Sequence, residues 1–278
     1  EGFTWNLTQY HDLFAILRAD VHPPLYFLLI DSWVEFVGTS VFALRYFSLL
    51  PSLLSIAVVY RLAKEIAHQR QSVALSVALN AAALMAVAEA ETFLAQEARS
   101  YTWHVLLACL SMWGFLRWCR RSKNTDLLLW MLSTIALVYT FYLGAFIGVA
   151  QGLYALLFLR NRQRVVAVGA LIVCALALLP WLLWTGTEQV SNVSRGEVIL
   201  PEAYDFWFRE FLRQYLTAQW ALVFGLMLSG IVIVGRKETR LHHTGILLVL
   251  WVGVPLLLTL ALNQLTPTYQ PRRISQII

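Results

Sequence analysis

Acidic and basic side chains that could carry out group transfer stand beside long apolar segments of this sequence. A carboxylate within hydrogen-bond reach of a hydroxyl can remove its proton. The planar guanidinium group of arginine forms paired hydrogen bonds with phosphate oxygens. These residue types therefore suit a reaction in which one group removes a proton while others hold an anionic phosphate. The candidates come from four separate places in the chain: Glu1, Asp20, His22, Arg45, Glu89, Glu91, Glu97, Arg99, Arg272 and Arg273.

Several of these side chains also have a purely structural explanation. The stretch Gln96-Glu97-Ala98-Arg99 could be a polar turn between two helices, with the arginine paired to the glutamate or to a phospholipid head group. The other candidates could brace a turn, form a partly buried pair, or anchor the chain at the interface by snorkelling; they are His22, Glu89 with Glu91, and Arg272 with Arg273.

The composition is that of an integral membrane protein. Of the 278 residues, 59% are hydrophobic and 13% are charged, and the mean hydropathy is +0.64. Soluble domains have about 25% charged residues. The 11 Trp and 11 Tyr residues fit the aromatic enrichment seen where membrane helices meet the interfaces. Cys109, Cys119 and Cys174 have no metal-ligand spacing, and we predict that they serve in packing.

Eight apolar segments have the length needed to cross the hydrocarbon core, which takes about 20 residues. A ninth segment, 24–38, is shorter, ends at Gly38, and carries Asp31 and Glu35 four residues apart on one helical face. We predict that this ninth segment lies on the membrane as an interfacial helix, entered through Pro23 and Pro24. The predicted spans are 46–62, 72–93, 100–118, 125–142, 144–160, 164–184, 217–235 and 243–262.

The charges separate cleanly if segment 24–38 does not span. One face of the membrane then holds 13 basic and 3 acidic residues, and the other holds 8 basic and 13 acidic residues. By the positive-inside rule the basic face is cytoplasmic. The first outer loop, 1–45, also contains a predicted amphipathic helix with apolar residues at Leu7, Tyr10, Leu13, Phe14 and Leu17. The other predicted outer loops are 94–99, 185–216 and 263–273.

We expect one membrane domain over 1–278, belonging to a longer protein because the chain begins at Glu1 without Met and ends in an apolar run. Within it, 1–45 is an outer loop, 46–184 holds spanning helices, 185–216 is an outer loop, and 217–278 holds helices and an outer loop. Nucleotide-binding and serine-hydrolase motifs are absent from the sequence, and we expect no nucleic-acid partner.

Three segments in this order resemble the C-superfamily (GT-C) membrane glycosyltransferases. They are ADVHPPLYFLL at 19–29, FVGTSVFALRYFSLLPSLLSIAVVYRLAKEI at 36–66, and FLAQEARSYTWHVLLACLSMWGFLRWCRR at 93–121. The resemblance is to the bacterial relatives of protein O-mannosyltransferases, with the aminoarabinose transferases of lipid A and the galacturonosyltransferases of rhizobial lipopolysaccharide. It is strong over 1–121 and continues chiefly through topology and the stretch YQPRRISQII. HPPL alone is a weak string, but HPPL with QEARSY about 70 residues later is fairly specific.

The resemblance implies an all-α fold, a polytopic transmembrane bundle of the GT-C type with interfacial helices in the first outer loop. It implies transfer of a sugar from a polyprenyl-phosphate donor to an acceptor hydroxyl, with inversion of the anomeric centre. The acceptor would be lipid A, another glycolipid, a cell-wall glycan or a protein. The protein would lie among membrane lipids, in the inner membrane of a bacterium, with its active site on the outer face.

The resemblance also implies roles for single residues. The family's base is typically the Asp of an Asp-Glu pair; Glu1 matches the second member, so the base itself would precede residue 1. Some relatives bind a divalent cation, for which Glu1 and Glu97 could be ligands, but no cofactor is assigned. The predicted catalytic residues are Glu1, Asp20 and Glu97; the predicted donor-phosphate ligands are His22, Arg45, Arg99, Arg272 and Arg273; and the other predicted cavity residues are Gln96, Tyr101 and Tyr269.

Two other functions remain open at this point. A transporter or lipid flippase would place its charged groups near the membrane midplane and carry Gly/Pro-broken helices in matching halves. Here Pro51, Pro180 and Pro255 are single kinks, and the charged candidates gather at one face. The other alternative is a lipid-handling subunit without activity. The residue before Glu1 would distinguish the enzyme from these alternatives, since an Asp there favours the enzyme.

Overall fold

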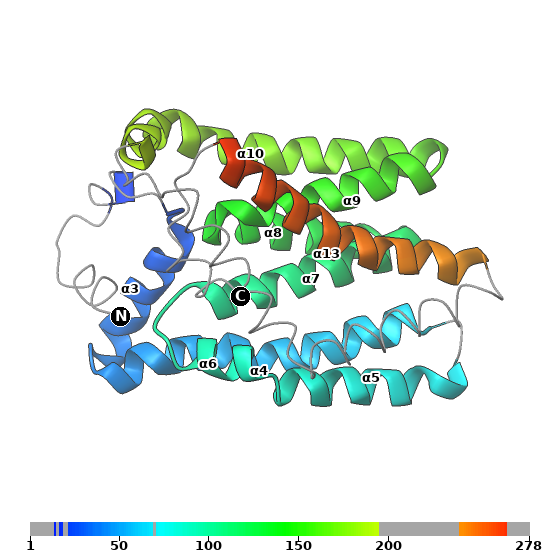
Figure 1. The fold of residues 1–278 in the computed structure, drawn as a ribbon, viewed down its shortest axis with the longest axis horizontal. Coiled ribbons are helices and arrows are strands. Elements are labelled where there is room, and N and C mark those ends of the chain that lie inside the picture. The colour runs from blue at the N-terminus through cyan, green and yellow to red at the C-terminus, as the bar shows by residue number, and fades with distance from the viewer. Residues whose placement is uncertain (1–13, 15–16, 19–21, 69–70, 195–238, 266–278) are drawn as a thin grey trace. The chain divides into compact units, whose positions relative to one another are not determined.

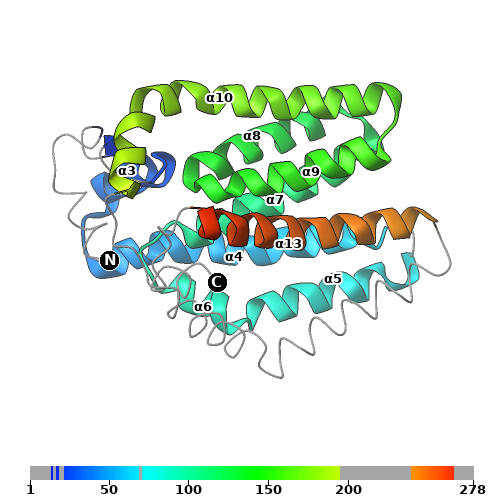
Figure 2. The same ribbon diagram turned by 45° about the horizontal axis from the view of Figure 1, so that its top comes forward.

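The computed structural model describes residues 14, 17–18, 22–68, 71–194 and 239–265. Every regular element in these ranges is a helix, which confirms the predicted all-α fold. The chain divides into two compact units, Glu1–Asn192 and Val193–Ile278. The first contains helices α3 to α9 and nearly all of α10 (Figures 1 and 2), and the second contains α13. The prediction of a single membrane domain stays a prediction.

Helix α3, Leu25–Val37, is the predicted interfacial segment. It follows Pro24 as its N-cap and ends at Gly38, whose φ of 82° suits glycine because residues with a side chain rarely adopt this backbone conformation. Its buried residues, Tyr26, Phe27, Ile30 and Val34, recur at helical spacing and form one face. Figure 1 shows α3 running across the direction of the long helices, as an interfacial helix would.

Helix α4, Val41–Ile66, begins earlier than predicted. The helix starts five residues before the predicted span 46–62, and the assignment of 1–45 to an outer loop stays a prediction. The reason for the earlier start is a cap: the backbone N–H of Ala43 donates to the Ser40 hydroxyl oxygen over 3.2 Å, which starts the helix at Val41. Arg45 therefore stands on the first turns of a helix rather than on a loop.

The predicted span 72–93 is two helices, which corrects the sequence prediction. Helix α5, Gln71–Ala86, ends before an extended residue, Ala88, and α6, Glu89–Ala95, follows. Glu89 and Glu91 both lie in the first turn of α6. Carboxylates are favoured at a helix N-terminus and costly within a membrane span, so the break gives both acids a better position.

Helices α7, Tyr101–Arg121, α8, Asn124–Thr140, and α9, Ala145–Phe158, are joined by buried polar side chains. The amide of Gln151 accepts from Trp130 Nε1 over 2.8 Å and donates to Ser111 Oγ over 2.9 Å. Ser111 in turn shares a 2.8 Å hydrogen bond with Thr134. A 3-10 turn, Tyr142–Gly144, links α8 to α9. Hydrogen bonds of this kind hold membrane helices together where apolar contacts discriminate little.

Helix α10, Asn161–Ser194, continues ten residues beyond its predicted end. Residues 185–194 are thus helical, and the assignment of 185–216 to an outer loop stays a prediction. Thr185 and Gln189 are buried on one side of this extension, and the Thr185 hydroxyl donates to the Trp181 carbonyl over 2.9 Å. Their side chains find partners inside the first unit, so a polar stretch remains helical.

By length and composition, Val41–Ile66 and Asn161–Gln189 are candidate membrane spans, with mean hydropathies of 1.7 and 2.6. Within the first unit, α4 lies between α5 and α7, and α8 packs on the other side of α7. In the second unit, α13, Thr239–Leu265, covers the predicted span 243–262 and contains Pro255. The predicted span 217–235 lies outside the described residues.

Candidate functional site

One core cluster joins the segments that carry most of the described candidates. It contains residues from α3 and α4, from the loop between α6 and α7, and from α10. Ala98, within the Gln96 to Arg99 stretch, is 1% exposed in this cluster. Aromatic rings complete it: Phe47 lies 5.8 Å from Tyr26 and 5.0 Å from Trp103, measured between ring centroids. The cluster therefore brings one end of α4 and α7 against the face of α3.

His22 and the two prolines lie at the start of α3. Pro23 and Pro24 are buried, and the Pro24 carbonyl accepts the first helical hydrogen bond, from Leu28, over 3.0 Å. The His22 ring is partly exposed and meets the edge of Phe27, with 6.1 Å between ring centroids. The buried prolines thus fix the point at which the histidine leaves the core.

The loop between α6 and α7 is held to α4 by its backbone. The Ser48 hydroxyl donates to the Arg99 carbonyl over 3.3 Å, and the Arg99 N–H donates to the Glu97 carbonyl over 2.8 Å. These bonds use main-chain atoms of Glu97 and Arg99. The carboxylate of Glu97 and the guanidinium group of Arg99 therefore take no part in them. Glu97 and Arg99 are half-buried, Gln96 is exposed, and Tyr101 begins α7.

Buried polar groups lie next to this loop, on α6 and α7. Glu91 is 7% exposed, and burial raises the pKa of its carboxyl group, against a smaller opposing effect of a hydrogen bond with the Ser52 hydroxyl. The ring of His104, one turn into α7, meets the ring of Phe141 edge-on, with 5.3 Å between the ring centroids. Among the described residues, His104 Nδ1 and Thr102 Oγ1 are buried without a hydrogen-bond partner.

The sequence prediction did not single out His104. The only signal for His104 in the sequence was its position, seven residues after Glu97 and one helical turn after Ser100 and Tyr101. Glu91 was a candidate for which the sequence favoured a structural role, as part of a partly buried pair with Glu89. Its hydrogen bond is with Ser52 of α4, a helix distant in the sequence, which no local pattern shows.

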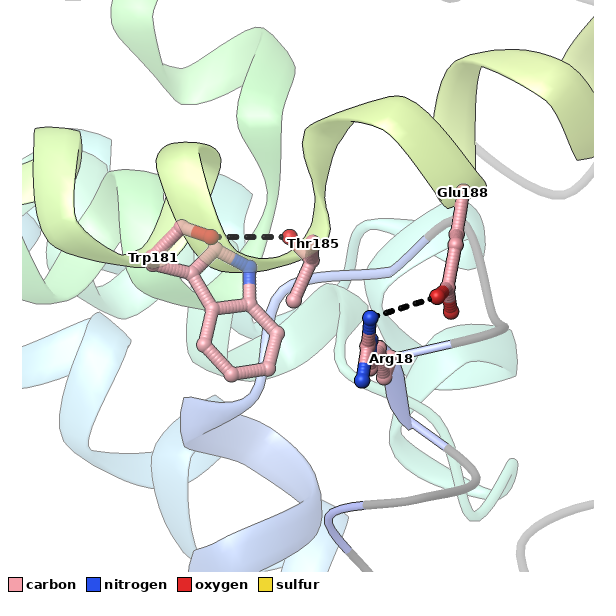
Figure 3. A network of polar contacts seen from close by, with 4 residues as sticks. All are labelled: Arg18, Trp181, Thr185 and Glu188. Atoms are coloured by element: carbon pink, nitrogen blue, oxygen red, sulfur yellow. Dashed lines mark hydrogen bonds and ion pairs between the residues drawn. The ribbon is translucent and has the colours of Figure 1, made fainter.

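A second set of contacts ties residues 17–18 to the last turns of α10. Arg18 forms a 2.7 Å ion pair with Glu188, and its guanidinium group lies 5.8 Å from the centre of the Trp184 ring. Figure 3 shows this pair beside the Thr185 to Trp181 hydrogen bond. The Gln189 side chain adds a buried hydrogen bond to the Leu17 carbonyl over 3.2 Å. The start of the described chain is thereby fixed near α3.

Some predicted site residues lie outside the described residues, namely Glu1, Asp20, Tyr269, Arg272 and Arg273. In the described part of the chain, no group of three or more His, Cys, Asp and Glu residues is placed to hold a metal ion. The divalent cation therefore stays a prediction. The described candidates that share one end of the first unit are His22, Arg45, Gln96, Glu97, Arg99 and Tyr101.

This end of the unit combines a carboxylate with three basic side chains on segments fixed by a common core. Such a set can hold a phosphate group through His22, Arg45 or Arg99 while a carboxylate such as Glu97 accepts a proton from a hydroxyl. The sequence model of one family, described as dolichyl-phosphate-mannose-protein mannosyltransferase, matches residues 21–184 of the chain. No curated protein and no solved structure matches the chain.

Proposed function

Because the chain belongs to the dolichyl-phosphate-mannose-protein mannosyltransferase family over residues 21–184, we propose that it transfers a sugar from a polyprenyl-phosphate donor to an acceptor hydroxyl at the α3 end of the bundle. The family makes the chain a membrane glycosyltransferase. The proposal adds that the transfer takes place on the outer face of the membrane and that it inverts the anomeric centre.

One observation carries the proposal. The buried contact of Ala98 with the α3 and α4 core places the loop that bears Glu97 and Arg99 at the end of the unit where His22 stands. These segments are about 70 residues apart in the sequence, and both fall within the matched range. A carboxylate and phosphate-binding cations at one end suit a transfer from a lipid phosphate.

In the proposed reaction, His22 and Arg99 hold the donor phosphate. A carboxylate, with Glu97 as the described candidate, takes the proton of the acceptor hydroxyl. The hydroxyl oxygen attacks the anomeric carbon from the side opposite the phosphate, and the bond between that carbon and the phosphate oxygen breaks. The electron pair leaves with polyprenyl phosphate, whose charge the cations stabilise. No nucleotide takes part.

The test is transfer of radiolabelled sugar from a panel of polyprenyl-phosphate sugars by the purified protein. We expect Glu97→Gln and Arg99→Ala to lower turnover by about a hundredfold or more, the range for a lost proton-transfer or charge-stabilising group. Glu35→Gln is the matched control, since Glu35 is an exposed acid of α3 at the same end and loses the same charge.

Folding is checked by thermal unfolding, which should differ little between Glu97→Gln and Glu35→Gln. Unchanged turnover in both Glu97→Gln and Arg99→Ala would sink the proposed site. The donor that supports the fastest transfer identifies the sugar, and a lack of transfer from every donor would count against the activity itself.

A further inference from the structure

A pocket of about 410 Å³ lies at the other end of the first unit, where α4 and α7 finish. We call it the basic pocket. It is separated from the candidate site by the length of both helices, since the site uses the first turns of α4 and α7. Its volume falls in the range of small-ligand sites, about 300 to 1,000 Å³. It is lined by Arg61, Lys64, Glu65, His68, Trp113, Arg117, Arg120 and Arg121.

The charge of the basic pocket is strongly positive. Five Lys and Arg side chains line it, against Glu65 in the lining and Asp126, which is paired to Arg117 behind it. Three positive charges are therefore in excess. Within the described residues, none of Arg61, Lys64 and Arg121 forms an ion pair. All three are exposed at the pocket, where a ligand can reach them.

Two guanidinium groups are held in fixed positions. Arg117 lies over the Trp113 ring at 4.7 Å and pairs with Asp126 over 2.8 Å, and Asp126 is 2% exposed. Arg120 pairs with Glu65 over 2.5 Å. Among the described residues, Arg117 Nε is buried without a hydrogen-bond partner. Since the pairs orient these side chains in advance, an anion would bind without ordering them first.

A simpler explanation is that basic residues favour the C-terminal turn of a helix. This accounts for Lys64 at the end of α4 and for Arg120 and Arg121 at the end of α7. It does not account for Arg61 and Arg117, which lie before the last turns and still face the same pocket. Nor does it account for the position of Trp113, whose ring lies under the guanidinium group of Arg117. The set is better explained by a bound anion.

We propose that the basic pocket binds a phosphate group, carried by the head group of an anionic membrane lipid. Guanidinium groups match phosphate oxygens through paired hydrogen bonds. The neighbouring helix α5 exposes Val73, Leu75 and Val77 at the same end, and these apolar side chains can face the acyl chains of a lipid seated there. Basic pockets between membrane helices bind lipid head groups in this way.

The experiment measures lipid retention by native mass spectrometry on the purified, delipidated protein. Phosphatidylglycerol is the anionic probe, and phosphatidylcholine is the zwitterionic comparison. The test variant is Arg61→Gln with Arg121→Gln, both exposed, so that no buried acid is left unpaired. The matched control is Arg160→Gln with Arg162→Gln, two exposed arginines at the same end, where Gln163 bonds to the Cys119 carbonyl.

We expect phosphatidylglycerol to bind in preference to phosphatidylcholine. The test variant should weaken this binding by about tenfold or more, given the contribution of each basic residue to anionic-lipid binding, while the control variant binds as the parent does. Equal losses in the two variants would overturn the proposal, because they would reveal diffuse attraction between charges. Equal binding of the two lipids would overturn it as well.

A competition arm with inorganic phosphate and pyrophosphate distinguishes the source of the phosphate group. Little displacement of the lipid at millimolar concentration supports a lipid head group. If phosphate or pyrophosphate displaces the lipid from the parent protein but not from the test variant, the pocket is a phosphate site. Its ligand is then a free phosphate or diphosphate. If neither a lipid nor a free phosphate binds in a way that depends on Arg61 and Arg121, the pocket is not a phosphate site.

Discussion

Glu91 and Glu97 are two carboxylates of one short stretch with different surroundings. Glu91 is buried next to Ser52 of α4, whereas Glu97 is half-buried on the loop that Ala98 and the Arg99 carbonyl hold to the core. Burial disfavours the charged form of Glu91. The proposed reaction therefore uses Glu97 rather than Glu91 as the group that accepts the proton.

The raised pKa of Glu91 makes stability depend on pH. Between the ordinary pKa of about 4.5 and the higher folded pKa, the folded state binds more protons than the unfolded state. Stability therefore falls as the pH rises through this window and stays at its lower level above it. Glu91→Gln removes the ionisable group, so it should raise the melting temperature near neutral pH. The gain should disappear below about pH 4.5.

The melting temperature of the detergent-purified protein, followed across this pH range, checks the prediction. Glu89→Gln is the control, because Glu89 is an exposed acid in the same turn of α6. A gain of equal size at every pH would mean that packing, rather than ionisation, explains the effect.

Part of the site could be predicted from single residues, and part could not. The HPPL and QEARSY stretches indicated where His22, Glu97 and Arg99 would matter, because these polar residues interrupt apolar segments. The neighbours of Glu91 and His104 could not be predicted, since their burial arises from helices that are distant in sequence. The roles of Glu1 and Arg272 stay predictions.

Helices α7 and α8 approach each other closely at Gly114. A Cβ atom at this position would lie 2.8 Å from the backbone nitrogen of Trp130 and 2.9 Å from its Cα atom. A backbone cannot move aside as a flexible side chain can. The packing of the two helices thus depends on the absence of a side chain at Gly114, as is common where membrane helices meet.

Gly114→Ala should lower the free energy of unfolding by about 1 to 3 kcal/mol, the usual cost of overpacking a core. The matched control is Gly169→Ala in α10, where a Cβ atom would meet nothing within 4 Å. That control should be neutral or slightly stabilising, since alanine favours a helix over glycine. Thermal unfolding of both variants checks the difference, and equal melting temperatures would show that α7 and α8 can separate without cost.

Helix positions were predictable from hydropathy, but some of their ends were not. Residues 72–93 are mostly apolar and were predicted as one span, yet α5 ends before Ala88, and Glu89 and Glu91 begin a new helix. Residues 185–194 are polar and were predicted as a loop, yet Thr185 and Gln189 are buried against earlier parts of the chain. The polar side chains of a segment do not show by themselves whether a distant part of the chain will supply their hydrogen-bond partners.

At the scale of the whole molecule, charge and apolar surface are arranged as a membrane protein requires. Many large apolar side chains are exposed along α4, α5 and α10, where acyl chains can cover them. Their polar counterparts gather at the two ends of the first unit. The α3 end carries Glu35 and the candidate site, and the other end carries the basic pocket.

The charge distribution predicts that these two ends lie on opposite sides of the membrane, with the basic end in the cytoplasm. Single cysteines at exposed positions test this after the three native cysteines are replaced. Glu35→Cys should react with an impermeant maleimide in intact cells, and Lys123→Cys should react only after permeabilisation. The reverse pattern would contradict the predicted orientation and the outer-face site.

The hydrogen bonds among Trp130, Gln151 and Ser111 have a consequence for motion. Sliding any one of α7, α8 or α9 past the other two by a turn, about 5.4 Å, would break at least one of these buried bonds. Those three helices therefore behave as a stationary frame. The α3 end is joined by aromatic contacts such as that between Tyr26 and Phe47, and by hydrogen bonds from side chains to main-chain carbonyls, such as that from Trp33 Nε1 to Ala43 over 2.9 Å. We therefore expect any movement that admits the proposed lipid donor to occur at the α3 end rather than among α7, α8 and α9.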